Sequence, residues 1–457
     1  MSKDEYLITD TPLKALTVFA MPMILGSFFQ QIYNMADSII VGQFVGSSAL
    51  AAVGACAALT NVFICVALGA GVGAGVLVSR YFGARKYGKM KTIVSTSLIS
   101  FLLLSIVLGV FGFFFANLMM SGLQTPADIL DDAVLYLRVY FVGFPFLFMY
   151  NILSTMFTSI GESKIPLGLL IFSSILNILM DLWMVAGLGL GVFGAAIATL
   201  IAQGISAVFS FLIFFARMQQ YKSPFNRFER QELYSMLRIA VPSVLQQSTV
   251  SIGMMIVQAV VNPFGTQALA GYTATMRVEN VFSLIFVSIG NAVSPYVSQN
   301  LGAKKYQRIR KGVHSGTYMA LLTSVVISGV MVLFGRNILS LFVSGEPEQI
   351  RQVLDIAYKY LFIMAIFLWV LYLLYVYRSA IQGLGNTLIP LASGIAEFVM
   401  RVSVALLLPK LIGEDGIFYA EICAWTSAAV LLFISYMIII RKYKDSSDSS
   451  ELPAKGL

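Results

Sequence analysis

Charged side chains are scarce in this sequence, and their scarcity excludes a soluble fold. Only 11% of the 457 residues are Asp, Glu, Lys or Arg, whereas 58% are hydrophobic, and the mean hydropathy is +0.84. A soluble domain carries roughly 25% charged residues. So many apolar side chains can stay exposed only to lipid, because the outer faces of membrane-spanning helices are apolar. The composition therefore predicts a membrane protein.

Cysteine and histidine are nearly absent as well. The three cysteines, Cys56, Cys65 and Cys423, lie in apolar stretches without paired spacing, and there is one histidine. We therefore expect neither a disulfide nor a Cys/His metal centre. There is no P-loop, which excludes an ATP-driven pump. The loops hold no cluster of His, Cys or acidic residues, so we expect no enzyme activity and no cofactor beyond a coupling ion.

Twelve apolar stretches are long enough to cross about 30 Å of hydrocarbon. They lie near residues 13–40, 49–80, 92–119, 133–158, 164–186, 191–216, 237–262, 267–299, 312–334, 353–380, 389–410 and 415–440. The charged N-terminus lacks a signal-peptide h-region, so the first stretch should be retained as a helix. The stretches predict an all-α polytopic protein. Its parts are a cytoplasmic N-terminus (1–12), an N-lobe (13–216), a cytoplasmic linker (217–236), a C-lobe (237–440) and a disordered, Ser-rich cytoplasmic tail (441–457).

The net charge of +8 comes from basic residues in short loops. They cluster around residues 80–91, 217–230 and 304–311, which lie on one side of twelve spans, whereas the opposite loops are neutral or acidic. Positively charged loops stay in the cytoplasm, so both termini should be cytoplasmic and the location should be the plasma membrane. A nucleic-acid-binding protein would carry such charges on a polar domain, so we expect no nucleic-acid partner.

The two halves of the sequence resemble each other at a fixed offset. GSSALAAVGA (46–55) aligns with GTQALAGYTA (265–274), and VSRYFGARKY (78–87) aligns with VSQNLGAKKY (297–306), both at a spacing of 219. Farther on, GESKIPL (161–167) aligns with GNTLIPL (385–391). Because each repeat holds six spans, the repeats are parallel and related by a pseudo-twofold axis along the membrane normal. Transporters built this way place their sites near the midplane.

Polar side chains inside the spans are candidates for an ion site, because they are costly in lipid and functional by default. They recur on single helical faces: Gln30, Asn34 and Asp37 in the first span, Asn177 and Asp181 in the fifth, and Thr199 and Gln203 in the sixth. Two carboxyl groups with amide and hydroxyl oxygens can bind sodium or share a proton. The competing explanation is that Asp37 and Asp181 lie near helix ends, hydrated or capping.

The second half offers different side chains. Its seventh span contains Gln246 but no acid, and its eighth contains Glu279. Glu397 and Arg401, four residues apart in the eleventh span, favour a structural ion pair, although Glu397 or Glu279 could instead bind substrate. Pro22 in the first span is a candidate gating hinge, because proline removes a helix hydrogen bond. The glycines at 69, 71, 73 and 75 follow no strand, so they predict close helix packing and not a dinucleotide motif.

QQIYNMADSIIVGQFVG, the basic SRYFGARK loop and the two-lobe repeat resemble the multidrug and toxic compound extrusion (MATE) family over residues 10–440. The resemblance implies two six-helix lobes and export of mostly cationic or amphipathic compounds in exchange for protons or sodium. The DinF-like branch has its cation site in the N-lobe, at positions that match Asp37, Asn177, Asp181 and Thr199. The backbone carbonyl of Ala195 could add a ligand. The branch's first-helix proline matches Pro22.

NorM-like members carry a seventh-helix glutamate, which this sequence lacks; this departure favours an N-lobe site. The resemblance leads us to expect a monomeric antiporter in the lipid bilayer with small-molecule substrates. A flippase for a lipid-linked saccharide, from the same broader superfamily, is the alternative. The side chains that we expect to line the substrate cleft are Gln30, Asn34, Asn151, Gln203, Gln246 and Glu279.

Overall fold

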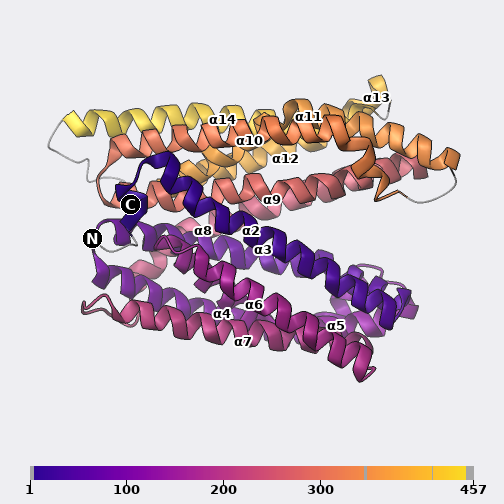
Figure 1. The fold of residues 1–457 in the computed structure, drawn as a ribbon, viewed down its shortest axis with the longest axis horizontal. Helices are drawn as coiled ribbons and strands as arrows, with labels where there is room; N and C mark the ends of the chain where they lie inside the picture. Colours follow the sequence, from indigo (N-terminus) through magenta and orange to yellow (C-terminus); the bar gives the residue numbers. More distant parts are fainter. Residues whose placement is uncertain (1–4, 344–346, 414, 449–457) are drawn as a thin grey trace. The chain divides into compact units, whose positions relative to one another are not determined.

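The computed structural model describes residues 5–343, 347–413 and 415–448, and nearly all of them are helical (Figure 1). Twelve of the helices in these ranges are long and apolar enough to cross a membrane, which confirms the predicted all-α polytopic fold. In the first half they are α2 (Pro12–Phe44), α3 (Ser47–Gly83), α4 (Tyr87–Gly122), α5 (Ala127–Ser159), α6 (Lys164–Asp181) and α7 (Gly191–Gln219). In the second half they are α8 (Arg230–Val261), α9 (Thr266–Gly302), α10 (Tyr306–Ser340), α11 (Pro347–Gly383), α12 (Leu388–Leu407) and α14 (Asp415–Asp448).

Short helical segments lie between or before the spans. They are α1 (Tyr6–Thr9), the π-helical turn η2 (Leu182–Gly187), the 3-10 turn η3 (Asn262–Phe264) and α13 (Pro409–Ile412). The helices run past the apolar stretches at both ends, so the connection between α7 and α8 is only residues 220–229. α14 continues to Asp448 and so includes the first residues of the tail; the disorder of the tail stays a prediction. Polar residues such as Lys continue a helix readily in water; residues 449–457 lie outside the described ranges.

The sequence repeat is reproduced in the backbone geometry. α3 and α9 are both 37 residues long and start and end exactly one repeat offset apart. Each is preceded by a glycine with positive φ, Gly46 at 117° and Gly265 at 97°. Each is followed by a basic residue in the left-handed region, Arg85 at 55° and Lys304 at 57°. A left-handed basic residue is uncommon, so its presence at both equivalent turns supports a duplicated origin.

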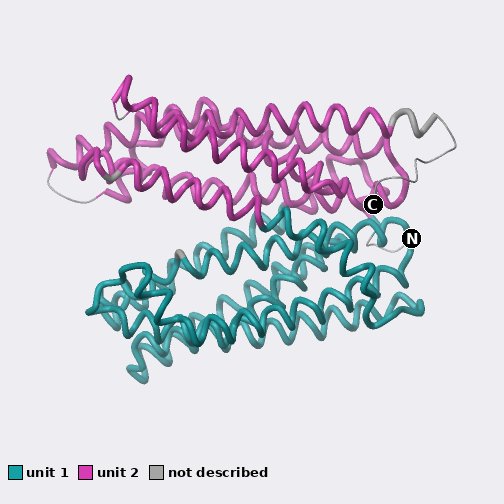
Figure 2. The backbone as a smooth tube through the Cα atoms, turned by 180° about the vertical axis from the view of Figure 1, so that it is seen from behind, with its two compact units in different colours: residues 1–5, 21–244 teal, residues 6–20, 245–457 magenta. Residues whose placement is uncertain are grey.

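The described chain divides into two compact units (Figure 2). Unit 1 contains residues 21–244, and unit 2 contains residues 6–20 together with the chain from Leu245 onward. α2 and α8 therefore each begin in one unit and end in the other. The boundaries lie close to Pro22 and Pro242, which are the prolines inside these helices. Each proline removes one backbone hydrogen bond at the point where the helix changes unit.

The segments that precede Pro22 and Pro242 are held by hydrogen bonds near the basic loop of each unit. In unit 2, Asn300 donates from Nδ2 to the carbonyl of Leu7 at 3.0 Å, and Lys305 donates from Nζ to the carbonyl of Ile8 at 3.1 Å. In unit 1, the backbone N–H of Asn226 donates to Thr92 Oγ1 at 3.1 Å. In both units the segment that precedes a crossing helix is thus bound to the helix pair around the basic loop.

Close backbone contact in unit 1 depends on glycine. A Cβ at Gly69 would lie 2.8 Å from Cα of Val244, and one at Gly73 would lie 2.7 Å from the carbonyl oxygen of Met236. Both contacts are shorter than a methyl group allows, so α3 and the first part of α8 pack backbone to backbone. The interpretation of these glycines as packing residues is confirmed.

Candidate functional site

Three helices of unit 1 bring the predicted ion-site residues together. Asp37 lies on α2, Asn177 and Asp181 lie one turn apart at the end of α6, and Thr199 lies on α7. Asn177 is 1% exposed and Asp181 is 0% exposed. The explanation of Asp181 as a hydrated residue at a helix end is therefore wrong.

Hydrogen bonds connect the four side chains. Asn177 donates from Nδ2 to Oδ2 of Asp181 at 2.8 Å, and its carbonyl oxygen accepts from the backbone N–H of Thr199 at 3.2 Å and from its Oγ1 at 3.3 Å. The carboxyl groups of Asp37 and Asp181 are close enough to act directly on each other. Two neighbouring carboxyl groups disfavour ionisation of both, so they can share a proton or a cation.

Two tyrosines complete the site, and neither was predicted from the sequence. The hydroxyl of Tyr33, on α2, is close enough to the side chain of Thr199 to interact with it. Tyr136, on α5, is an electrostatic neighbour of Asp37 and Tyr33. Tyr33 could have been found, because it precedes Asp37 by one helical turn. Tyr136 has no such signal in the sequence.

The backbone is irregular directly after Asp181. α6 ends at this residue and continues as the π-helical turn η2, in which the N–H of Leu188 donates to the carbonyl of Trp183 at 2.9 Å. In the equivalent part of the second repeat, residues 406–411, α12 ends at Leu407 and the short helix α13 begins at Pro409, without a π-helical turn. π-helical turns are rare and occur frequently at functional sites, so this difference marks the unit 1 site.

The chemistry of the donor set fits a small cation. Oδ1 of Asp37 and Oδ1 of Asp181 are buried, and neither has a hydrogen-bond partner within the described parts of the chain. A buried carboxylate oxygen without a partner is costly unless a proton or a cation neutralises it. Ala195, the expected carbonyl ligand, is buried on α7 one turn before Thr199. The site therefore suits sodium or a proton.

The expected cleft residues lie at different places in the two units. Gln203 lines a small cavity of unit 1 with Thr199, Tyr136 and Tyr140. Gln30 and Asn34 are exposed on α2, and Asn34 donates from Nδ2 to Oε1 of Gln31 at 3.2 Å. Asn151 donates from Nδ2 to the carbonyl of Leu147 within α5 at 2.8 Å. Gln246 and Glu279 are buried in unit 2.

The predicted ion pair of unit 2 is present and belongs to a larger network. Glu397 accepts from Arg401 at 2.9 Å, as expected, and also from Arg378 at 2.8 Å. Arg401 also donates to Glu421 at 2.8 Å. The sequence does not indicate the part of Arg378 or Glu421, because their partners lie on other helices.

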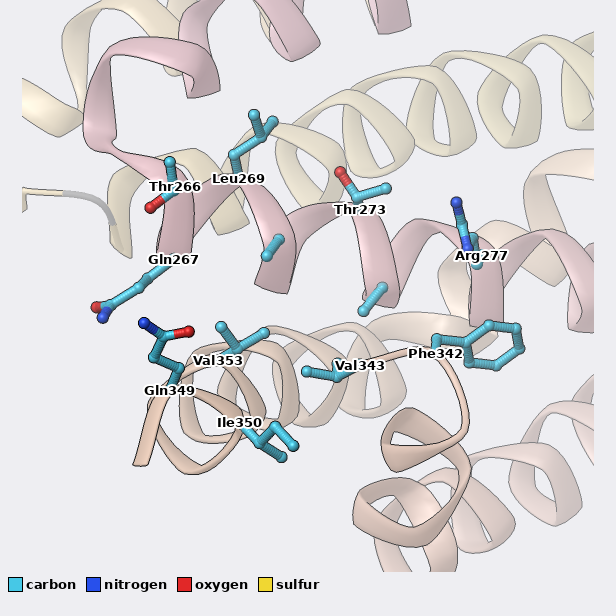
Figure 3. A pocket seen from close by; sticks show the side chains of 12 residues that line it. Thr266, Gln267, Leu269, Thr273, Arg277, Phe342, Val343, Gln349, Ile350 and Val353 are labelled. Carbon is cyan, nitrogen blue, oxygen red and sulfur yellow. The ribbon is translucent and has the colours of Figure 1, made fainter. Parts of the chain in front are cut away.

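A separate pocket opens in unit 2 between the beginnings of α9 and α11 (Figure 3). Thr266, Gln267 and Arg277 line it from α9, and Gln349 and Ile350 line it from α11. Among the described residues, its lining carries an arginine and neutral side chains but no carboxyl group. It therefore has a different chemistry from the site in unit 1.

Twelve spanning helices that bring two carboxyl groups together, one of them fully buried, are typical of an integral membrane transport protein. A family model described as MatE matches residues 22–183 and 242–407. The chain belongs to this family of multidrug and toxic compound extrusion (MATE) transporters.

Relatives match along almost the whole chain. "Probable multidrug resistance protein YoeA" of Bacillus subtilis (strain 168) is 26% identical over 449 residues, which cover 94% of each chain. "Multidrug export protein MepA" of Staphylococcus haemolyticus (strain JCSC1435) is 26% identical over 462 residues, which cover 98% of this chain and all of the relative. A solved structure described as "Crystal structure of MATE in the bent conformation" has a TM-score of 0.91 at 23% identity and covers 98% of this chain and 100% of its own. This last likeness concerns the fold.

Proposed function

We propose that this protein is a secondary active antiporter that exports small amphipathic or cationic compounds in exchange for protons or sodium. The observation that carries the proposal is the close pair of carboxyl groups in spanning helices, formed by the half-buried Asp37 and the buried Asp181. An ionisable pair in this position is functional by default. The names of the relatives, multidrug resistance and multidrug export proteins, support drugs as the exported class.

The site residues would hold the coupling ion through oxygen atoms. Asp37 and Asp181 supply carboxylates, Asn177 supplies its amide oxygen, and Thr199 supplies its hydroxyl. Bound sodium, or a second proton, would neutralise the charge that the buried pair carries when the ion leaves. Because Asp37 is on α2, a change in its charge acts on the helix that Pro22 makes easier to bend.

The remaining features of the proposal concern the setting. We place the protein in the plasma membrane as a monomer in the lipid bilayer, with both termini in the cytoplasm. The basic loops around residues 80–91 and 304–311 support this orientation. The work of the protein is then transport without a chemical reaction, and its partners are small molecules.

Efflux from reconstituted vesicles tests the proposal. With sodium and pH gradients imposed separately, we expect one or both to drive export of a cationic dye. Asp37→Asn and Asp181→Asn should each abolish gradient-driven export, while the purified variants stay folded. The reason is that a neutral amide cannot take up and release a proton and lacks the negative charge that binds sodium. Export at the wild-type rate in both variants would contradict the site assignment. Stimulation by neither gradient would contradict antiport, and binding of a lipid-linked saccharide without dye export would favour a flippase.

A further inference from the structure

Unit 2 buries a second group of charged side chains inside its spanning helices. The group comes from four helices and consists of Glu279 on α9, Arg378 on α11, Glu397 and Arg401 on α12, and Glu421 on α14. None of the five is more than 8% exposed. Burial of charge in a spanning helix is costly, so each charge must be matched.

Four of the five members, Arg378, Arg401, Glu397 and Glu421, are paired with one another by direct contact. Arg401 holds Glu421 with Nε and Nη2, at 2.8 to 3.1 Å, and holds Oε1 of Glu397 at 2.9 Å. Arg378 holds the other oxygen of Glu397 at 2.8 Å. The two guanidinium groups therefore neutralise two carboxylates.

Glu279 is the carboxyl group that remains. Across the described chain it has neither an ion pair nor a hydrogen bond, and the charges that act on it are Glu421, Arg401 and Glu397. Around it also lie the phenol groups of Tyr272 on its own helix and of Tyr360 and Tyr375 on α11. When all five side chains are ionised, the three carboxylates and two guanidinium groups give the group a net charge of −1. One positive charge must therefore come from outside the protein.

The burial of Glu279 favours the smallest positive charge. Glu279 is 8% exposed, so little of its surface is available to the ammonium group of a drug-sized compound. A proton needs no room. Nη1 of Arg401 is also buried without an acceptor among the described residues. After Glu279 loses its proton, its carboxylate could accept a hydrogen bond from this group.

The repeat shows why this group differs from the site of unit 1. At the offset that aligns the starts of α6 and α12, Arg401 takes the position of Asn177. Where unit 1 holds an amide beside two acids, unit 2 holds a permanently charged guanidinium. Arg401 thus acts as a tethered cation, and only the additional acid, Glu279, is free to exchange a charge.

From this geometry we infer that Glu279 is a second proton-binding carboxyl group, in unit 2, that takes up one proton independently of Asp37 and Asp181. Uptake converts its carboxylate to the carboxylic acid, and release returns the proton to solvent and leaves the carboxylate facing Arg401. The site lies in the other unit from the proposed coupling pair, so it adds a second point at which protons act on the protein.

Infrared difference spectroscopy on the full-length protein in sodium-free lipid tests the inference. Between roughly pH 6 and 9, exposed carboxyl groups stay ionised, so the C=O stretch of a carboxylic acid reports buried groups. In the double variant Asp37→Asn/Asp181→Asn, we expect one titrating carboxylic-acid band to remain. Adding Glu279→Gln should remove it, and adding Glu279→Asp should shift its frequency. Glu348→Gln, at an exposed position, is the matched control and should leave the band unchanged.

The outcomes separate this inference from the proposed function, since the spectrum requires neither substrate nor transport. If no titrating band remains in the double variant, or if the band persists after Glu279→Gln, the inference is wrong. Because Glu279→Asp retains the carboxyl group, it keeps the test decisive if the glutamine variant does not fold. A band that is unmoved by Glu279→Asp would also overturn the inference.

Discussion

At the scale of single residues, the geometry of α2 decides which side chains reach the ion site. Successive helix residues are about 100° apart, so Tyr33, four before Asp37, and Asn34, three before it, flank Asp37 on opposite sides. The site lies on the Tyr33 side, and Asn34 is exposed. Spacing could identify the face with Asp37, but only packing against α6 and α7 selects which half of that face is used.

The hydroxyl of Tyr33 should strengthen ion binding through Thr199. A hydrogen bond between the Tyr33 hydroxyl and the Thr199 side chain would contribute about 0.5–1.5 kcal/mol. Tyr33→Phe should therefore weaken the apparent affinity for the coupling ion by about 2- to 10-fold. The measurement is the sodium or proton concentration that gives half-maximal efflux. Tyr140→Phe is the control, because the Tyr140 hydroxyl is buried but has no hydrogen-bond partner in the described residues. Equal effects of the two substitutions would contradict a specific role for Tyr33.

The spacing of Asn177 and Asp181, with Thr199 on the next span, was sufficient to predict that these side chains come together. The residues lie four apart on one helical face, and a buried polar face must meet other polar groups. The cleft residues were less predictable. Asn151 is satisfied by the carbonyl of its own helix, which any asparagine in a span can achieve, so its polarity carried no information about a ligand.

At the scale of helices, glycine positions set the distances between neighbours. In α10, a Cβ at Gly312 would lie 1.9 Å from Cε1 of Tyr296 on α9, whereas a Cβ at Gly329 has no atom within 4 Å. Tyr296 is fully buried and donates from its hydroxyl to the carbonyl of Arg308. The ring therefore cannot move aside, and the two helices require a glycine at Gly312.

Gly312→Ala should lower the free energy of unfolding of the protein by about 1–3 kcal/mol, because overpacking a rigid contact costs this much. Gly329→Ala, on the same helix, should be neutral or stabilising by up to about 1 kcal/mol, because alanine favours helix. Thermal unfolding in lipid nanodiscs measures both. A Gly329→Ala variant as unstable as Gly312→Ala would mean that helix propensity or lipid contact, and not the Tyr296 ring, governs this helix.

At the scale of the whole molecule, the twelve-span count was accessible from hydropathy, because a bilayer requires apolar stretches of a minimum length. The helix ends were not. Hydrogen bonding along the backbone continues beyond the lipid, so α14 extends to Asp448. The assignment of residues 6–20 to unit 2 was also inaccessible, because it follows from contacts such as Asn300 with Leu7, which join residues far apart in the sequence.

The orientation of the molecule can be tested by labelling. In a background without native cysteines, Lys311→Cys near the basic loop should react with a membrane-impermeant maleimide only in inside-out vesicles. Thr125→Cys, in the loop between α4 and α5, should react only in right-side-out vesicles. The expected pattern follows from the retention of positive loops in the cytoplasm. The reverse pattern would place the termini outside the cell.

The sharing of α2 and α8 between the units has a consequence for ancestry. If the first six-helix half were made alone, residues 6–20 would lack the second half, to which they belong. If the second half were made alone, residues 220–244 would lack the first half, to which they belong. Such a half would be complete only after exchanging these segments with another copy, as domain-swapped dimers do. The gene duplication recorded in the repeat would then have fused two chains that already depended on each other. Fragments 1–219 and 220–457, produced separately, should accordingly be recovered together.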